Sequence, residues 1–157
     1  MQVLSKELKA VAVTVDMSEP NTSITRDQCM SVDNFSYRCR RRRDSKGRTY
    51  GANDPVELCF NVRLNSADLA QPLYRLLNDN DHGIVSFVFN ATFSETKRMN
   101  GYEEAMAVEG FIVDIQEEYR GAVSASEEEQ IILSARMMVR AITYLAQNDN
   151  KTLRFIQ

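Results

Sequence analysis

The chain has 157 residues, the length of one domain large enough to bury a hydrophobic core. Hydrophobic residues make up 43% and charged residues 26% of the sequence, as in ordinary globular proteins. The net charge of −3 excludes a chain-wide nucleic-acid-binding surface. The lack of an apolar run of about eighteen residues excludes a transmembrane helix.

The N-terminal residues and the cysteines predict a protein that is made in the cytosol. Valines alternate through residues 8–17, which predicts a strand, and the short apolar run lacks the cleavage region of a signal peptide. The three cysteines, Cys29, Cys39 and Cys59, have no metal-like spacing. They predict reduced thiols rather than a disulfide framework or a metal site.

The next part of the chain predicts two strands joined by an exposed segment. Residues 18–28 are polar and rich in turn-forming residues, so they predict a loop. A strand follows from Met30, and its apolar positions change phase near Asn34, which predicts a β-bulge. Residues 40–55 contain two glycines and a proline and predict a long exposed loop. Residues 56–64 then alternate cleanly and predict a second strand.

Residues 65–79 predict the single helix of the chain. Leucines recur there at helical spacing, and Ser66 is expected to be the N-cap. Pro72 either kinks this helix or marks where its regular part begins. Gly83 is expected to end the helix in a C-cap role.

Two more strands are predicted after the helix. Residues 84–93 alternate with their phenylalanines facing inward. Residues 105–119 also alternate, and their phase shifts at Gly110, which predicts a second bulge. A turn over residues 121–130 then leads to the final part of the chain.

Residues 128–147 predict the longest strand. The odd positions are small or apolar without a break, whereas the even positions are mixed and include Arg136, Met138, Arg140 and Ile142. This period-two pattern is typical of a strand with one buried face and one partly covered face. A helix is the alternative, because alanine, leucine, methionine and arginine are good helix formers. A helix would, however, turn the two arginines to the same side as an isoleucine.

The predicted elements together indicate the fold class. The chain contains about seven strands and one helix, and a short piece after the long strand. Long antiparallel strands with bulges are able to curl and close. We therefore expect a mainly β protein, an antiparallel β-barrel of about seven strands with one flanking α-helix.

No combination of residues predicts catalysis. His82 is the only histidine, and neither a nucleophile elbow nor a second histidine accompanies it. The carboxylates lie at a strand end and in a turn, where solvated charge is the common explanation. Glu109, in an otherwise apolar strand, is a candidate for a buried or interface charge. We predict that the protein is not an enzyme and has no cofactor or metal site.

A run of arginines is the sharpest local feature. The basic residues are Arg40, Arg41, Arg42, Arg43, Lys46 and Arg48. One interpretation is phosphate binding, helped by Tyr37 and Tyr50. The other is an extended hairpin arm whose arginines pair with acidic groups of a neighbouring subunit. An acidic chain with one basic segment favours the arm.

The order and spacing of these segments resemble the hemolysin-coregulated protein (Hcp) family, the tube proteins of type VI secretion. The resemblance lies in the order of the segments. A strand ends in the basic segment SYRCRRRRDSKGRTYG and is followed by the strand VELCFNVRL, a helix and another strand. The strand AVEGFIVDIQEEY, a polar turn and a long closing strand complete the pattern. A basic arm with a D-x-x-G-R-like turn, here Asp44, Gly47 and Arg48, resembles the Bacteroidetes branch. The resemblance covers roughly residues 29–147.

The resemblance implies a single Hcp-like β-barrel domain over residues 1–157. It implies hexameric rings that stack into a tube and carry effectors. The protein would be exported together with the effectors, without a signal peptide, either out of the cell or into target cells. The partners would be further copies of the chain and the spike, sheath and effector proteins of the secretion apparatus, with no membrane and no reason to expect nucleic acid.

Two surfaces follow from a ring of this kind. The basic arm is expected to contact acidic residues of another subunit, for which Glu117, Glu118 and Glu127 to Glu129 are the candidates. The mixed face of the long strand is expected to line the lumen or to lie against the neighbouring barrel. Its residues are Arg136, Met138, Arg140 and Ile142.

A monomeric small-barrel binding module is the alternative function. Its basic loop would take an anionic ligand or nucleic acid. Hydrodynamic size distinguishes the two, because one predicts rings of about six chains and the other a monomer.

Overall fold

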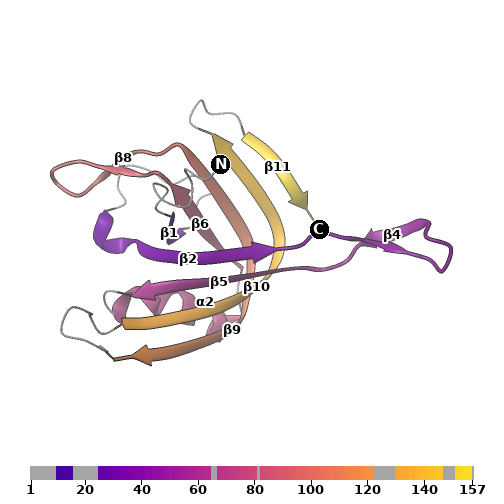
Figure 1. The fold of residues 1–157 in the computed structure, drawn as a ribbon, viewed down its shortest axis with the longest axis horizontal. Helices are drawn as coiled ribbons and strands as arrows, with labels where there is room; N and C mark the ends of the chain where they lie inside the picture. Colours follow the sequence, from indigo (N-terminus) through magenta and orange to yellow (C-terminus); the bar gives the residue numbers. More distant parts are fainter. Residues whose placement is uncertain are drawn as a thin grey trace.

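The chain is built mainly of β-strands in the computed structural model, which describes residues 10–15, 25–64, 67–80, 82–121, 130–146 and 151–156 (Figure 1). One antiparallel sheet contains seven strands in the order β11-β10-β5-β2-β1-β6-β9. A further pairing of β9 with β10 closes six of these strands into a barrel, and β11 is added outside the ring. The predicted barrel is therefore confirmed. The seven strands are β1 (Ala10–Val15), β2 (Met30–Tyr37), β5 (Val56–Leu64), β6 (Gly83–Phe89), β9 (Glu104–Arg120), β10 (Gln130–Ala146) and β11 (Lys151–Ile156).

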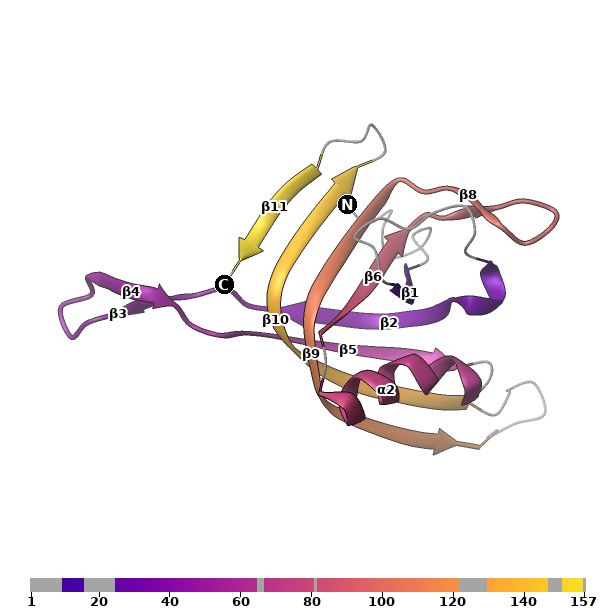
Figure 2. The same cartoon turned by 180° about the vertical axis from the view of Figure 1, so that it is seen from behind.

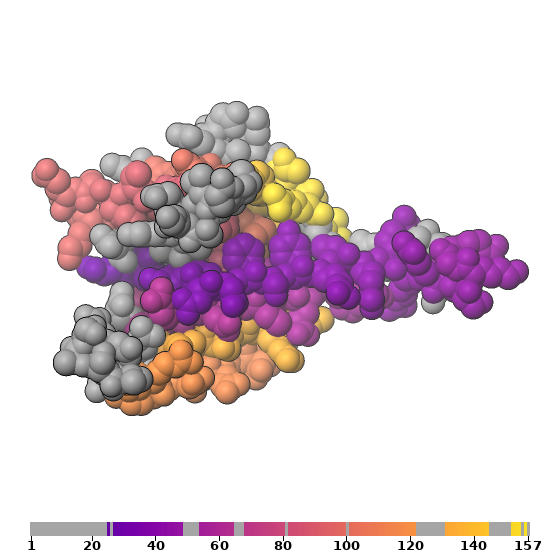
Figure 3. All heavy atoms as spheres, viewed as in Figure 1, coloured from indigo at the N-terminus to yellow at the C-terminus, as the bar shows by residue number. Residues whose placement is uncertain are grey.

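The basic segment forms a hairpin, as its interpretation as an extended hairpin arm predicted, and is not an irregular loop. Strands β3 (Arg41–Arg43) and β4 (Thr49–Asn53) pair antiparallel and continue the paths of β2 and β5 away from the barrel. The hairpin projects as a narrow arm from one end of the molecule (Figures 1 and 3). Alternation could not predict these strands, because a run of polar residues carries no apolar period.

The predicted strand over residues 84–93 is divided into two elements. Asn90 adopts the left-handed conformation with φ of 54°, which ends β6. The chain then forms a second hairpin from β7 (Thr92–Phe93) and β8 (Met99–Gly101). Asparagine tolerates this conformation better than most residues, so it is a natural place for the strand to stop.

A short 3₁₀ helix, η2 (Ala67–Ala70), leads into the α-helix α2 (Gln71–Asp79). Pro72 lies in the first turn of α2, so it marks the start of the regular helix and does not kink it. The predicted N-cap, Ser66, lies outside the described residues. The helix lies along the lower part of the barrel, where it packs against β9 (Figure 2).

The helix ends at Asn80 and not at the predicted Gly83. Asn80 is the C-cap, in the left-handed conformation with φ of 50° and ψ of 46°. Gly83 is already part of β6, and a Cβ atom there would overlap the side chain of Leu76. This glycine is therefore explained by close packing of the helix on the strand rather than by a helix cap.

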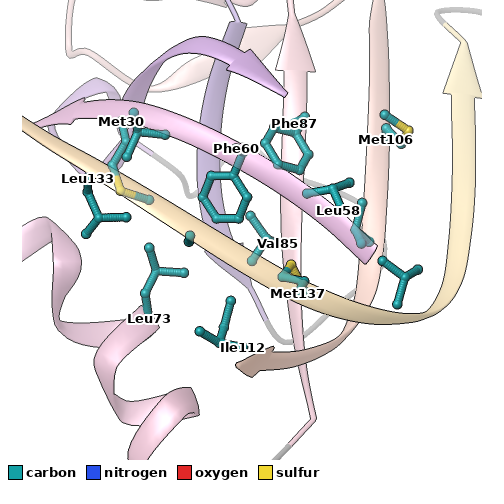
Figure 4. Close-up of a cluster of buried hydrophobic side chains, with 14 of the residues drawn as sticks. Met30, Leu58, Phe60, Leu73, Val85, Phe87, Met106, Ile112, Leu133 and Met137 are labelled. Carbon is teal, nitrogen blue, oxygen red and sulfur yellow. The ribbon is translucent and has the colours of Figure 1, made fainter. Parts of the chain in front are cut away.

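The barrel core is lined by the inward positions of β5, β6, β9 and β10 and is covered at one side by Leu73 of α2 (Figure 4). Phe87 lies at its centre, stacked on Phe35 at 4.7 Å between ring centroids and edge-on to Phe60 at 5.4 Å. Burial of each such side chain stabilises the fold by about 1.5–3 kcal/mol. The other fully buried core residues include Leu58, Val62, Val85, Leu133 and Met137.

The predicted faces of the long strand are confirmed up to Val139 and wrong beyond it. The odd positions from Leu133 to Val139 are buried. Ile142, which was expected on the outer face, is 0% exposed and belongs to the core. The reason is a bulge: Val139 pairs with Gly110 and Ala141 with Glu109, so Arg140 has no partner on β9. The extra residue reverses the inward and outward positions that follow it.

This bulge lies where β10 changes its neighbour. Up to Val139 the strand pairs with β5, and from Ala141 it pairs with β11. The strand is strongly curved along its length (Figures 1 and 2). The bulge therefore turns the corner of the barrel.

The other predicted bulges are partly confirmed. Asp33 is the extra residue in β2, next to the predicted Asn34. On β9 the extra residue is Val113 rather than Gly110, since Ile112 and Asp114 pair with consecutive residues of β10. Val113 is consequently 46% exposed while Ile112 is buried.

Candidate subunit interface

The tip of the basic arm is held by Asp44. The backbone N–H of Asp44 donates to the Arg48 carbonyl oxygen at 2.8 Å, and that of Gly47 donates to the Asp44 carbonyl oxygen at 2.9 Å. Gly47 has φ of 82°, a conformation that side chains disfavour. The Asp44 carboxylate accepts bonds from the N–H groups of Lys46 and Arg48, both at 2.9 Å, and from Arg48 Nε at 3.0 Å. The D-x-x-G-R segment is therefore a closed turn.

The pKa of Asp44 is lowered from its ordinary value of 3.8, chiefly by the backbone hydrogen bond from Arg48. The ordering of the turn by this carboxylate should thus be complete above pH 3.8 and lost as the pH falls through the lowered pKa. We expect the amide proton shifts of Lys46 and Arg48, followed by NMR, to titrate together below pH 3.8. Titration at or above that value would contradict this hydrogen bonding.

The base of the arm is held by Asp54. Its carboxylate oxygens accept from Arg40 Nε at 3.4 Å and from Arg42 Nε at 3.2 Å. Its backbone N–H donates to the Arg40 carbonyl oxygen at 2.8 Å. Among the described residues, Arg41, Arg43 and Lys46 make no ion pair. With six basic and two acidic residues, residues 40–54 carry a net charge of +4.

The two acidic candidates that the structure describes lie at the other end of the molecule. Glu117 and Glu118 are near the end of β9, which points away from the arm (Figure 1). Residues 117–129 contain five glutamates and one arginine, a net charge of −4. Glu127 to Glu129 lie outside the described residues. The structure does not bring the arm together with Glu117 or Glu118 within one chain, so a contact with these two residues needs a second copy.

Glu117 and Glu118 point to opposite faces of β9, as neighbouring strand residues do. Glu117 accepts a hydrogen bond from Tyr74 of α2. Desolvation is the larger cause that raises the pKa of this tyrosine, and the bond to Glu117 is the second. Glu118 is exposed and pairs with Arg120 at 3.5 Å. Only Glu118 therefore belongs to the outer face of the barrel.

The outer face of β2, β5, β10 and β9 is polar along most of its length, and we call it the polar face. It contains the ion pairs of Arg136 with Glu57 at 3.6 Å and of Arg63 with Asp33 at 2.8 Å. The predicted residue Met138 is half-buried on this side, and Arg140 is exposed at the bulge. The residues of the polar face are Asp33, Asn34, Ser36, Glu57, Cys59, Asn61, Arg63, Asp114, Gln116, Glu118, Ser134 and Arg136.

His82 and Glu109, the remaining candidates for chemistry, lie on the outside of the barrel near the bulge. His82 is exposed, and its ring lies 4.1 Å from that of Phe111. Glu109 is half-buried and pairs with Ile84 and Ala141. Within the described part of the chain, no three histidine, cysteine or carboxylate side chains are grouped as metal ligands.

Sequence reasoning missed a cluster that fastens β11 to the barrel. The guanidinium of Arg154 lies 4.3 Å from the centroid of the Tyr144 ring, and it donates to Tyr37 Oη at 3.3 Å. A hydrogen bond to Glu104, with desolvation, raises the pKa of Tyr144. Tyr37, which the sequence suggested for phosphate binding, contacts Arg154 in the structure. Tyr37 and Arg154 are 117 residues apart in the sequence, which explains why no local pattern predicted their contact.

No helix in the described ranges is both long and apolar enough to cross a membrane. No protein-family model and no curated protein matches the sequence.

Solved structures of Hcp proteins are similar to the chain over nearly its whole length. An Hcp protein crystal structure has a TM-score of 0.62 at 13% identity, covering 96% of this chain and 98% of that one. Hcp1 from Flavobacterium johnsoniae has a TM-score of 0.54 at 12% identity, covering 93% and 99%. A double mutant of Hcp1 from E. coli EAEC 042 has a TM-score of 0.55 at 9% identity, covering 92% and 96%. The chain therefore has the fold of the Hcp proteins, as the order of its sequence segments predicted.

Proposed function

We propose that the chain is the structural subunit of a type VI secretion inner tube, which forms hexameric rings that stack and carry effectors. The fold supports this proposal, because Hcp proteins and a protein described as belonging to a type six secretion system share it. The spike, sheath and effector proteins of such an apparatus would be the partners, and the protein would be exported with its cargo.

The observation that carries the proposal is the separation of charge along the molecule. A preformed arm with a net charge of +4 projects from one end, and a segment with a net charge of −4 begins at the other. Identical copies placed one behind the other would bring opposite charges together, which is a heterologous contact that repeats without limit. Exposed ion pairs contribute only about 0–1 kcal/mol each, so several must act together.

We assign the polar face to the lumen wall. The buried centre of a protein interface is depleted of charged residues, whereas this face carries ion pairs and several amide and hydroxyl groups. Such a surface stays hydrated and holds cargo weakly. The exposed apolar residues Leu153 and Ile156 of β11 are better suited to contacts between neighbouring subunits of a ring.

Replacing Arg41, Arg42 and Arg43 by Ala should weaken ring stacking and leave the rings intact. The substitution removes three of the six positive charges of the arm and touches no core residue. High salt should act in the same way, because the screening length falls from about 10 Å at 0.1 M to about 3 Å at 1 M. Light scattering coupled to size-exclusion chromatography reports ring mass, and electron microscopy reports stacking.

Arg75→Ala, which removes an exposed charge from α2, is the control and should stack normally. If neither the arm substitutions nor high salt weakens ring stacking, the arm does not contribute to stacking. A wild-type chain that is monomeric at all concentrations would favour the monomeric binding module instead.

The same proposal includes the absence of intrinsic hydrolase or transferase activity. The exposed His82 is the only histidine of the sequence, and its ring lies against that of Phe111.

A further inference from the structure

The charges of the arm are divided between its two faces. Arg40 and Arg42 both donate to the carboxylate of Asp54, at 3.4 and 3.2 Å. The pairing of β3 with β4 shifts register between Arg41 and Arg43. Within β3, successive residues point to opposite faces, so we place Arg41 and Arg43 opposite Arg42, whose guanidinium pairs with Asp54. Both are exposed and have no ion pair with any residue that the structure describes.

The two faces differ in what they offer to an acidic partner. A carboxylate that approaches Arg40 or Arg42 meets the negative charge of Asp54 as well, and it must compete for guanidinium groups that are already paired. A carboxylate that approaches the other face meets two arginines with no acidic residue between them. The closed turn at Asp44 and the backbone bond between Asp54 and Arg40 fix this arrangement before any partner binds.

We propose that the arm binds through one face only, with Arg41 and Arg43 contacting a glutamate-rich surface and with Arg40, Arg42 and Asp54 holding the base of the arm in shape. The partner surface is the acidic end of a second copy of this chain, and that part of the inference rests on the proposed function. The division of the arm itself does not depend on it.

Two double variants of the full chain test the division, because each removes two positive charges from the same arm. They are Arg41→Gln with Arg43→Gln, and Arg40→Gln with Arg42→Gln. Binding of a fluorescein-labelled decaglutamate peptide is followed by anisotropy at low salt, and circular dichroism confirms that each variant is folded. We expect the first variant to bind about tenfold more weakly than the wild type, and the second less than about threefold.

Equal losses in the two variants, or a larger loss in the second, would overturn the one-face arrangement, since charge number alone would then decide binding. Light scattering on the same samples tests the proposed function separately. A monomeric wild type would overturn the tube proposal, while the difference between the two double variants would still decide how the arm binds.

Discussion

Replacing Met137 by Asp is expected to unfold the barrel, whereas replacing its neighbour Met138 by Asp should leave the barrel folded. Met137 is 0% exposed and packs in the main core. An aspartate there would place a carboxylate among apolar side chains without a partner, at a cost of several kcal/mol. Domains of this size are stable by only about 5–15 kcal/mol, so the loss should remove most of the folded population.

Met138 lies on the other side of the same strand. It is half-buried and pairs with Glu57 of β5 and Phe111 of β9. An aspartate at this position would stay hydrated and would meet the like charge of Glu57, which costs up to about 1 kcal/mol. We therefore expect a folded variant that assembles poorly or carries cargo differently.

Thermal unfolding by circular dichroism and assembly size by light scattering check the two variants side by side. Met137→Leu is the control for the core position, because it nearly conserves volume and should cost less than about 1.5 kcal/mol. Equal unfolding of the two aspartate variants would show that the faces of β10 are assigned incorrectly.

The same strand shows how far the sequence predicts the fold. Alternation identified the buried residues up to Val139, because strand geometry alone sets the period of two. It failed at Ile142, because the phase there depends on the unpaired Arg140. That bulge arises where β5 gives way to β11 as the neighbour of β10, and such a change of partner has no local signature.

The sequence predicted only those features of the arm that depend on residues close together in the chain. The charge run is a local pattern, so the sequence revealed an exposed basic segment, and the resemblance to the Hcp family implied the turn at Asp44 and Gly47. The pairing of Asp54 with Arg40 and Arg42 joins residues at opposite ends of the segment, and only the hairpin brings them together. The end of α2 was predicted at Gly83 and lies at Asn80, because both asparagine and glycine tolerate the left-handed conformation of a C-cap.

Alternation alone separates the two acidic candidates. Glu117 and Glu118 are consecutive residues of one strand and must therefore face opposite sides. Glu117 contacts Tyr74 on the helix side, so Glu118 is the one that the outer face presents.

Replacing Gly110 by Ala should destabilise the protein by about 3 kcal/mol or more. Gly110 is buried, and it pairs with Gly83 on one side and with Val139 at the bulge on the other. A Cβ atom at this position would overlap the carbonyl oxygen of Met138 and would lie 3.0 Å from its carbonyl carbon. These are backbone atoms of the strand corner, so they cannot turn aside as a side chain can.

Two other glycine substitutions make the test specific. At Gly121 the nearest atom to a new Cβ is in the Tyr119 ring at 3.7 Å, so Gly121→Ala should change stability by less than about 0.5 kcal/mol. At Gly83 the obstacle is the side chain of Leu76, which can change rotamer, and the loss should be intermediate. In urea unfolding, Gly121→Ala should be the most stable of the three variants, Gly83→Ala intermediate and Gly110→Ala the least stable. A Gly110→Ala protein as stable as Gly121→Ala would contradict the close approach of β9 and β10 at the corner of the barrel.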